Sequence, residues 1–176
     1  MTTVPEKLES DRPDDGHDDR ADDLLDQRLY QQYCFACGRQ NPIGLQMQFR
    51  RDGADGVRCD YTPRPEDQGF PGVIHGGVLV ALMDEAMAWA MFAAHRALGV
   101  TAKMETRYRQ PVSPDARLTV RARVARERGR RIEAESTIED AEGARLVETS
   151  ALFLRLPADQ ESTMIGELGW DVVGPH

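Results

Sequence analysis

One run of the sequence, Val78–Leu98, constrains the fold more than any other part of the chain. It reads VLVALMDEAMAWAMFAAHRAL, and its many Ala, Leu and Met residues favour a helix. It holds no Pro or Gly before Gly99, where a helix can end. Its first sixteen residues are apolar on every side, apart from the dipeptide Asp84-Glu85. A helix that is apolar all round is buried all round, so we expect the rest of the chain to wrap around this one.

Segments with the alternating pattern of β-strands lie on both sides of this helix. Before it, residues 45–49 and 57–61 alternate across a turn and predict a hairpin. After it, short turns join four strand-like segments, which favours an antiparallel meander. These segments are Thr101–Gln110, Leu118–Val124, Ile132–Ile138 and Arg145–Leu156. The sequence therefore predicts an α+β fold, in which a curved antiparallel sheet of about six strands wraps one long central helix.

The charge of the chain is concentrated at its beginning. The formal net charge is −8, and residues 1–26 hold ten Asp or Glu against three Lys or Arg, so the remainder carries only −1. We expect residues 1–28 to form a disordered acidic arm, 29–157 the folded domain and 158–176 a loose tail. A nearly neutral body argues against a nucleic-acid-binding protein. The acidic start is unlike a signal peptide, and by this sequence-based interpretation no apolar run reaches the length needed to span a membrane, so we expect a cytoplasmic protein.

The dipeptide Asp84-Glu85 is the chemical anomaly of the predicted helix. A buried carboxylate without a partner is costly, so it either finds hydrogen-bond donors or shifts its pKa. Neighbouring helix residues point about 100° apart, so only one of the two can face a given site. An exposed edge of the helix that carries both carboxylates is the structural alternative.

The motif His75-Gly76-Gly77 stands where the predicted helix begins. The first N–H groups of a helix have no partner inside it, and glycine lets an oxygen approach that backbone closely. Such a terminus can stabilise a developing oxyanion. Gly77 and Asp84 lie two turns apart on one face, about 10 Å along the axis, which is too far for one small reacting group. In a two-fold dimer with antiparallel helices, Asp84 of one subunit would face the Gly77 amide of the other.

The stretch IHGGVLVALMDEAMAWA resembles the signature of the PaaI-like branch of the hotdog-fold acyl-CoA thioesterases. CFACGRQNPIGLQMQF and TAKMETRYRQPV resemble neighbouring segments of the same group, and the likeness covers roughly Cys34 to Leu156. The resemblance implies hydrolysis of an acyl-CoA thioester by a homodimer or dimer of dimers, with no metal or redox cofactor. It places the catalytic acid on Asp84, as general base or nucleophile, and the oxyanion donor on the Gly77 amide.

The same resemblance implies that the loop residues His75 and Gly76 and the strand residue Thr101 contact substrate. His75 could equally serve to fix the loop by a hydrogen bond. Two other activities remain open: a hotdog hydratase or dehydratase acting on enoyl-CoA, and a non-catalytic acyl-CoA-binding module. A carboxylate beside a thioester argues against pure binding.

Two further groups of residues carry weaker signals. Arg121 and Arg123 belong to an arginine cluster that could attract the phosphates of coenzyme A, but interleaved glutamates favour a solvated outer sheet face. Cys34 and Cys37 form a Cys-x-x-Cys pair, whereas a structural zinc site needs four ligands. The available extra ligands are Cys59 and His75, at no familiar spacing, so we expect two buried thiols rather than a metal.

Overall fold

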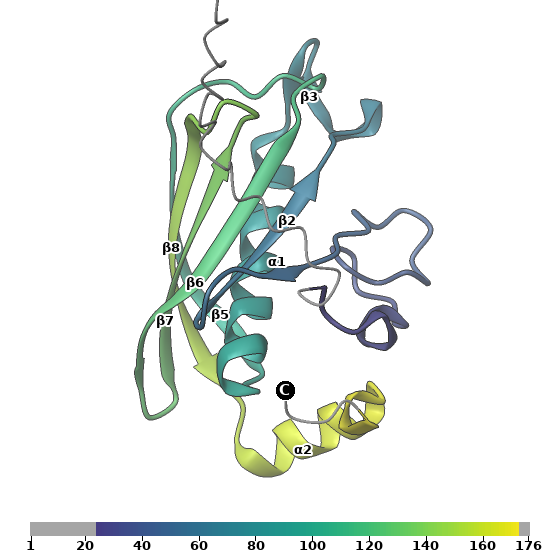
Figure 1. Ribbon diagram of the computed structural model, residues 1–176, viewed down its shortest axis with the longest axis vertical. Coiled ribbons are helices and arrows are strands. Elements are labelled where there is room, and N and C mark those ends of the chain that lie inside the picture. The colour runs from purple at the N-terminus through teal and green to yellow at the C-terminus, as the bar shows by residue number, and fades with distance from the viewer. Residues whose placement is uncertain (1–23, 173–176) are drawn as a thin grey trace, which may run out of the picture.

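A single antiparallel sheet wraps one side of a long helix in the computed structural model, which describes residues 24–172 (Figure 1). Within that range the sheet has six strands in the order β1-β2-β6-β7-β8-β5. Their bounds are β1 (Arg50–Arg51), β2 (Gly56–Tyr61), β5 (Gly99–Tyr108), β6 (Leu118–Arg128), β7 (Arg131–Glu139) and β8 (Arg145–Arg155). A separate pair, β3 (Gln68–Phe70) and β4 (Val73–Ile74), precedes the central helix α1 (Gly76–His95). The predicted α+β architecture is therefore confirmed.

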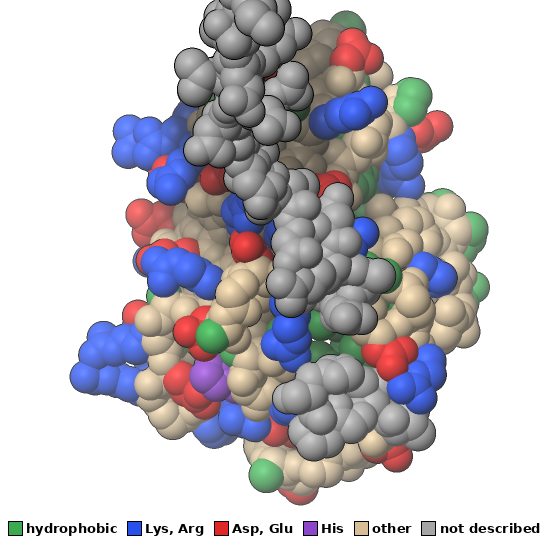
Figure 2. Space-filling model, viewed as in Figure 1, with side chains coloured by type: hydrophobic (Ala, Val, Ile, Leu, Met, Phe, Trp, Pro, Cys, Tyr) green, Lys and Arg blue, Asp and Glu red, His purple; other side chains and the backbone are tan. Residues whose placement is uncertain are grey.

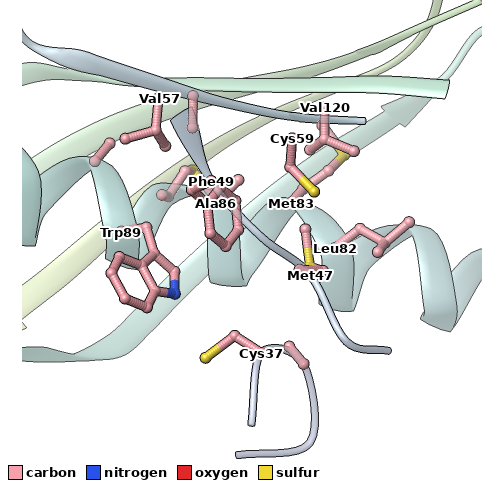
Figure 3. Close-up of a cluster of buried hydrophobic side chains, with 14 of the residues drawn as sticks. Cys37, Met47, Phe49, Val57, Cys59, Leu82, Met83, Ala86, Trp89 and Val120 are labelled. Atoms are coloured by element: carbon pink, nitrogen blue, oxygen red, sulfur yellow. The ribbon is translucent and has the colours of Figure 1, made fainter. Parts of the chain in front are cut away.

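Strand alternation decides which side chains reach the helix. In β6, Leu118, Val120 and Ala122 are buried and point to α1, while Thr119 and Arg121 between them are more exposed. The same alternation recurs in β7, and β6 and β7 pair as a hairpin in continuous register apart from one bulge. Figure 3 shows the resulting core, in which Val57 and Val120 of the sheet face Met83 and Ala86 of the helix. The sheet thus supplies one continuous apolar wall for α1.

The expected first hairpin is shorter than the alternation suggested. Residues 45–49 alternate as predicted, with Leu45, Met47 and Phe49 buried, but ladder pairing with β2 is confined to Arg50 and Arg51. The helix starts two residues earlier than expected and ends at His95, because Arg96 adopts a left-handed conformation with φ of 52°. Residues 24–49 cross the side of α1 away from the sheet (Figure 1).

The helix is not buried all round, which corrects the expectation drawn from its composition. The sheet covers one side and the N-terminal segment covers another. One stripe along α1, beside β5, stays half-buried or exposed. Its residues recur at each turn of the helix: Gly77, Val80, Ala81, Asp84 and Ala88. The stripe is apolar apart from Asp84, so this single chain leaves an apolar strip of its central helix only partly covered.

The apolar run of the central helix is also longer than the sequence pattern suggested. By length and composition alone, Gly76–His95 would qualify as a membrane span, contrary to our sequence-based expectation. Half of its most apolar window is buried inside the domain. This is how the core helix of a globular protein behaves, and such a helix passes the same test of length and composition.

The C-terminal segment is packed rather than loose, at least as far as Trp170. It forms helix α2 (Ala158–Glu167) and a 3-10 turn, η4 (Trp170–Val172). The Glu161 carboxylate accepts from the Leu98 backbone N–H at 2.7 Å and pairs with Arg155. Trp170 is buried against the core.

The folded part also begins earlier than predicted. Leu25 is buried and its N–H donates to the carbonyl of Phe49, and a 3-10 turn, η2 (Gln27–Tyr30), follows. Residues 1–23, which make up most of the predicted acidic arm, lie outside the described part of the chain, as do residues 173–176.

Candidate active site

Asp84 forms a short hydrogen bond with a residue from the neighbouring edge strand. The Thr101 hydroxyl of β5 donates to Asp84 Oδ1 at 2.7 Å. Asp84 is half-buried and Thr101 is exposed, so the carboxylate is held in a defined position while remaining open to solvent. The structure therefore brings together two of the residues that the sequence singled out, seventeen positions apart in the chain. A carboxylate fixed in this way keeps free lone pairs that can accept a proton from water.

The start of α1 is closed by its own loop histidine. His75 is the N-cap, and its Nδ1 accepts a hydrogen bond from the Gly77 N–H at 2.9 Å. The predicted oxyanion donor is therefore engaged by His75 in this structure. The neighbouring Gly76 is held by β5, because the Tyr108 hydroxyl donates to the Gly76 carbonyl at 3.0 Å. A side chain at Gly76 would lie only 3.1 Å from that hydroxyl oxygen, which explains the glycine at this position.

The loop that carries His75 is anchored by Asp67, which the sequence analysis did not identify. The Asp67 carboxylate accepts from the Tyr61 hydroxyl at 2.6 Å and pairs with the Arg64 guanidinium at 2.9 Å. Burial would raise the pKa of Asp67, but the hydrogen bonds from Arg64 and Tyr61 outweigh it and lower that pKa. The Asp67 backbone carbonyl also accepts from the His75 N–H at 2.8 Å. The helix start is thus tied to a loop residue whose buried carboxylate pairs with the more exposed Arg64 side chain.

A pocket of about 480 Å³ opens beside the helix start. Its walls are apolar for the most part and come from the β3–β4 pair, the first turn of α1 and the end of β5. They include Phe70, Ile74, His75, Leu79 and Val112. Asp84 does not line this pocket, because it lies two turns further along α1. Within one chain, the pocket and the carboxylate are therefore separate features.

Glu85 occupies a different environment from its neighbour. Its Oε1 accepts from the Trp89 indole N–H at 3.0 Å, and the Cys34 thiol lies 3.5 Å from Oε2. Burial, reinforced by the negative charge of Cys34, raises the pKa of Glu85 to about 7. A hydrogen bond from Cys37 lowers the pKa of Cys34 to about 5, and the same hydrogen bond together with burial raises the pKa of Cys37. Asp84 thus lies on an open face of α1, whereas Glu85 lies on a face that the rest of the chain covers.

Arg121 and Arg123 are not brought to the Asp84 site. Arg121 pairs with Asp52 at 2.5 Å and with Glu139 at 3.3 Å, and Arg123 pairs with Glu135 at 2.6 Å. Both side chains lie on the face of β6 that points away from α1. Figure 2 shows one face of the molecule, on which basic and acidic side chains are interleaved. These contacts agree with the solvated sheet face that the interleaved glutamates suggested.

One long helix wrapped by a six-stranded antiparallel sheet is the hotdog fold. The family model of the thioesterase superfamily matches residues 71–147, which run from the loop before α1 into β8. Over this stretch, which is less than half of the chain, the sequence is similar to the thioesterase superfamily.

Curated and solved proteins share this similarity. Acyl-coenzyme A thioesterase THEM4 of Bos taurus is 23% identical over 140 residues, 78% of this chain and 57% of that protein. The chain therefore spans little more than half the length of this relative. A crystal structure of a thioesterase superfamily protein matches with a TM-score of 0.65 and 29% identity, covering 69% of this chain and 60% of the other. The PaaI protein of E. coli shares the fold with a TM-score of 0.59 at 17% identity, covering 64% and 81%.

Proposed function

We propose that this protein hydrolyses acyl-CoA thioesters to a free acid and coenzyme A. The observation that carries the proposal is the Asp84 carboxylate, held at 2.7 Å by Thr101 on the open face of the central helix of a domain similar to the thioesterase superfamily. A structure with the same fold from Streptococcus pneumoniae, 16% identical with a TM-score of 0.59, was solved with coenzyme A. The pocket at the helix start has the apolar walls that an acyl chain needs.

Asp84 would activate a water molecule as general base, or attack the thioester carbon itself. The thioester carbonyl oxygen would bind at the Gly77 N–H, where backbone dipoles at the helix N-terminus favour the developing negative charge. Because His75 Nδ1 now accepts from that N–H, the substrate oxygen must share the donor or replace the imidazole. His75 is thus suited to keep the donor covered until substrate arrives.

Each site would be built from two chains. Gly77 and Asp84 of one helix are about 10 Å apart along its axis, so one thioester cannot reach both. The stripe that includes both residues is only partly covered in a single chain, and it adjoins the edge strand β5, where Val100 is 57% exposed. A second copy packed against this stripe with its helix antiparallel would bury the apolar residues. It would also bring its pocket and Gly77 amide to Asp84 of the first chain.

The activity is tested by measuring thiol release from a panel of aliphatic and aromatic acyl-CoA substrates, together with the free acid formed. Equal amounts of coenzyme A and acid are expected, with the Asp84→Asn protein as the inactive control. Loss of an enoyl-CoA substrate without thiol release would instead identify a hydratase. Tight acyl-CoA binding without turnover would identify a binding module. Either result would refute the proposed hydrolysis.

The two-chain site is tested by pairing two different inactive variants in one dimer. Asp84→Asn and Gly77→Pro proteins should each be nearly inactive alone; Pro removes the N–H at a first-turn position where the ring is tolerated. In a mixed dimer one site carries both defects and the other carries none. With random pairing about half the dimers are mixed, so activity should recover to about a quarter of wild type per site. Absence of recovery in verified mixed dimers would show that both groups act within one chain.

A further inference from the structure

The two sulfurs of the Cys-x-x-Cys pair and one carboxylate oxygen converge on the side of α1 away from the sheet. One ligand atom each from Cys34, Cys37 and Glu85 lie within 4.8 Å of one another. Cys34 and Cys37 come from a turn in the N-terminal segment, and Glu85 comes from the central helix, so the cluster joins parts of the chain some 51 residues apart. All three cysteines of the chain are free thiols in this structure.

The distances within the cluster fit a shared ion. Zinc is bound by sulfur at about 2.3 Å and by carboxylate oxygen at about 2.0–2.2 Å, which places tetrahedral S and O ligands about 3.5–3.7 Å apart. Cys34 Sγ lies 3.6 Å from Oε1 and 3.5 Å from Oε2 of Glu85. The Cys34 sulfur and the Glu85 carboxylate therefore already have the spacing of two zinc ligands, and the Cys37 sulfur lies within 4.8 Å of both ligand atoms.

The surroundings of the cluster orient its ligands. The Trp89 indole N–H donates to Glu85 Oε1 and fixes the carboxylate. The Ala36 backbone N–H donates to Cys34 Sγ at 3.3 Å, and the Gln32 side-chain amide donates to Cys37 Sγ at 3.6 Å. Donors of this kind hold metal ligands in place and favour negatively charged sulfur.

The charge of the cluster is not balanced by a basic residue. Across residues 24–172, Glu85 forms no ion pair with any Lys, Arg or His. A carboxylate that is withdrawn from water without a cationic partner is costly. A divalent cation would supply the missing charge, and two sulfurs with one oxygen are donors that zinc accepts.

We propose that Cys34, Cys37 and Glu85 bind one zinc ion, with a fourth position open to water. Glu85 supplies the third ligand that the sequence analysis did not count. Cys59 and His75, the ligands considered there, lie elsewhere: His75 caps α1, and Cys59 packs with Met83 and Val120 on the sheet side of the helix, while Cys37 lies in the loop on the other side (Figure 3). The ion would pin the N-terminal segment to the central helix one residue after Asp84.

The test is zinc analysis of the purified full chain, followed by titration of chelator-treated protein with zinc and with cobalt(II). About one zinc per chain is expected, and cobalt should give the charge-transfer absorption of thiolate coordination. This measurement requires neither a variant nor enzymatic activity. A full chain that takes up no zinc, or whose cobalt spectrum lacks a thiolate band, would overturn the proposal, as would a Cys34–Cys37 disulfide in the purified protein.

Variants locate the ion. Cys34→Ser, Cys37→Ser and Glu85→Gln should each weaken zinc binding at least about 100-fold, since even outer-sphere partners of a metal are worth about 10- to 100-fold. Cys59→Ser is the matched control, because it removes a buried thiol outside the cluster and should leave affinity unchanged. Equal affinity in Cys34→Ser and Cys59→Ser proteins, both shown to be folded by circular dichroism, would assign the metal to another place and refute this site.

Discussion

The two long sides of α1 that the sheet leaves uncovered differ in what lies against them. The side that carries Glu85 is covered by the N-terminal segment and by the C-terminal Trp170, and the side that carries Asp84 is open beside β5. Two consecutive carboxylates therefore meet opposite conditions, because a turn of about 100° separates them. Glu85 contacts an indole and a thiol, while Asp84 contacts one exposed hydroxyl. One helix can therefore pack against both terminal segments of the domain on one side and keep an acid accessible to solvent on the other.

The covered side is also the aromatic side. Trp89 stacks on Tyr30 with ring centroids 4.9 Å apart and on Phe49 at 5.5 Å, and Trp170 packs against it at 5.4 Å. These rings come from three separate parts of the chain, so burying them ties both ends of the described chain to the helix. Apart from Val80 and Asp84, the stripe on the open side carries small residues, such as Ala81 and Ala88. Small residues allow a second chain to approach closely.

The sharpest way to break this comparison is to neutralise each carboxylate in turn. Asp84→Asn should lower turnover by about 10²- to 10⁴-fold, because it keeps the shape and removes the general base or nucleophile. Glu85→Gln should change turnover per folded molecule by less than about threefold, since its side chain faces away from Asp84. Steady-state thioester hydrolysis of both proteins, with folding checked by circular dichroism, is the measurement. Equal losses in the two variants would remove the distinction between the two sides.

The covered side should carry the larger share of stability. Trp170→Ala removes a buried ring that packs at a tilt against Trp89 and Phe92 and donates to the Leu29 carbonyl. We expect a loss of about 3–5 kcal/mol, or on the order of 10 °C in Tm, measured by thermal unfolding. Met164→Ala on the same C-terminal segment is the control, because Met164 is 41% exposed and should cost little. A Trp170→Ala protein as stable as the control would mean that this segment does not hold the covered side together.

On the open side, the Thr101 hydroxyl that holds Asp84 can be removed without leaving a cavity in the core. Thr101→Val should reduce kcat by about tenfold, because a hydrogen bond to a carboxylate contributes about 1.5–3 kcal/mol and this one is exposed to water. Thr101→Ser should restore most of the activity, since it retains the donor. If Thr101→Val and Thr101→Ser lose activity equally, the methyl group rather than the hydroxyl supports Asp84.

The smallest effects are expected from truncating the N-terminus, which tests where the segment that covers the Glu85 side of α1 begins. Removing residues 1–23 should leave activity and Tm unchanged, because this acidic stretch holds few apolar residues that could pack on the domain. Extending the deletion to residue 26 removes buried Leu25 and should cost about 1.5–3 kcal/mol. Thermal unfolding of the two truncated proteins distinguishes these outcomes. A large loss from the shorter deletion would show that the arm covers a site or an interface.

The sequence predicted those parts of the fold whose pattern is local. The helix and the four later strands follow from periodicity, and Asp84 stands out because it interrupts an apolar run. The packing of Trp170 could not be read in the same way, because its partners Leu29 and Trp89 are far away in the chain and its own segment is mostly polar. The position of Glu85 beside Cys34 depends on the same kind of distant contact. A Cys-x-x-Cys pair signals a possible ligand set, but only the fold shows which acid completes it.

The strand order has a consequence for how the chain reaches this state. Strands β6, β7 and β8 are consecutive and joined by short turns, whereas β2 must find β6 and β5 must find β8 across long stretches of chain. Closing a long loop costs entropy before any contact offsets it, so pairings between distant segments form late. We therefore expect the β6–β8 meander to be the folding nucleus, onto which α1 and the two flanking strands then condense. Substitutions in the meander, such as Ile132→Val, should slow folding, whereas equally destabilising changes in β2 should mainly accelerate unfolding.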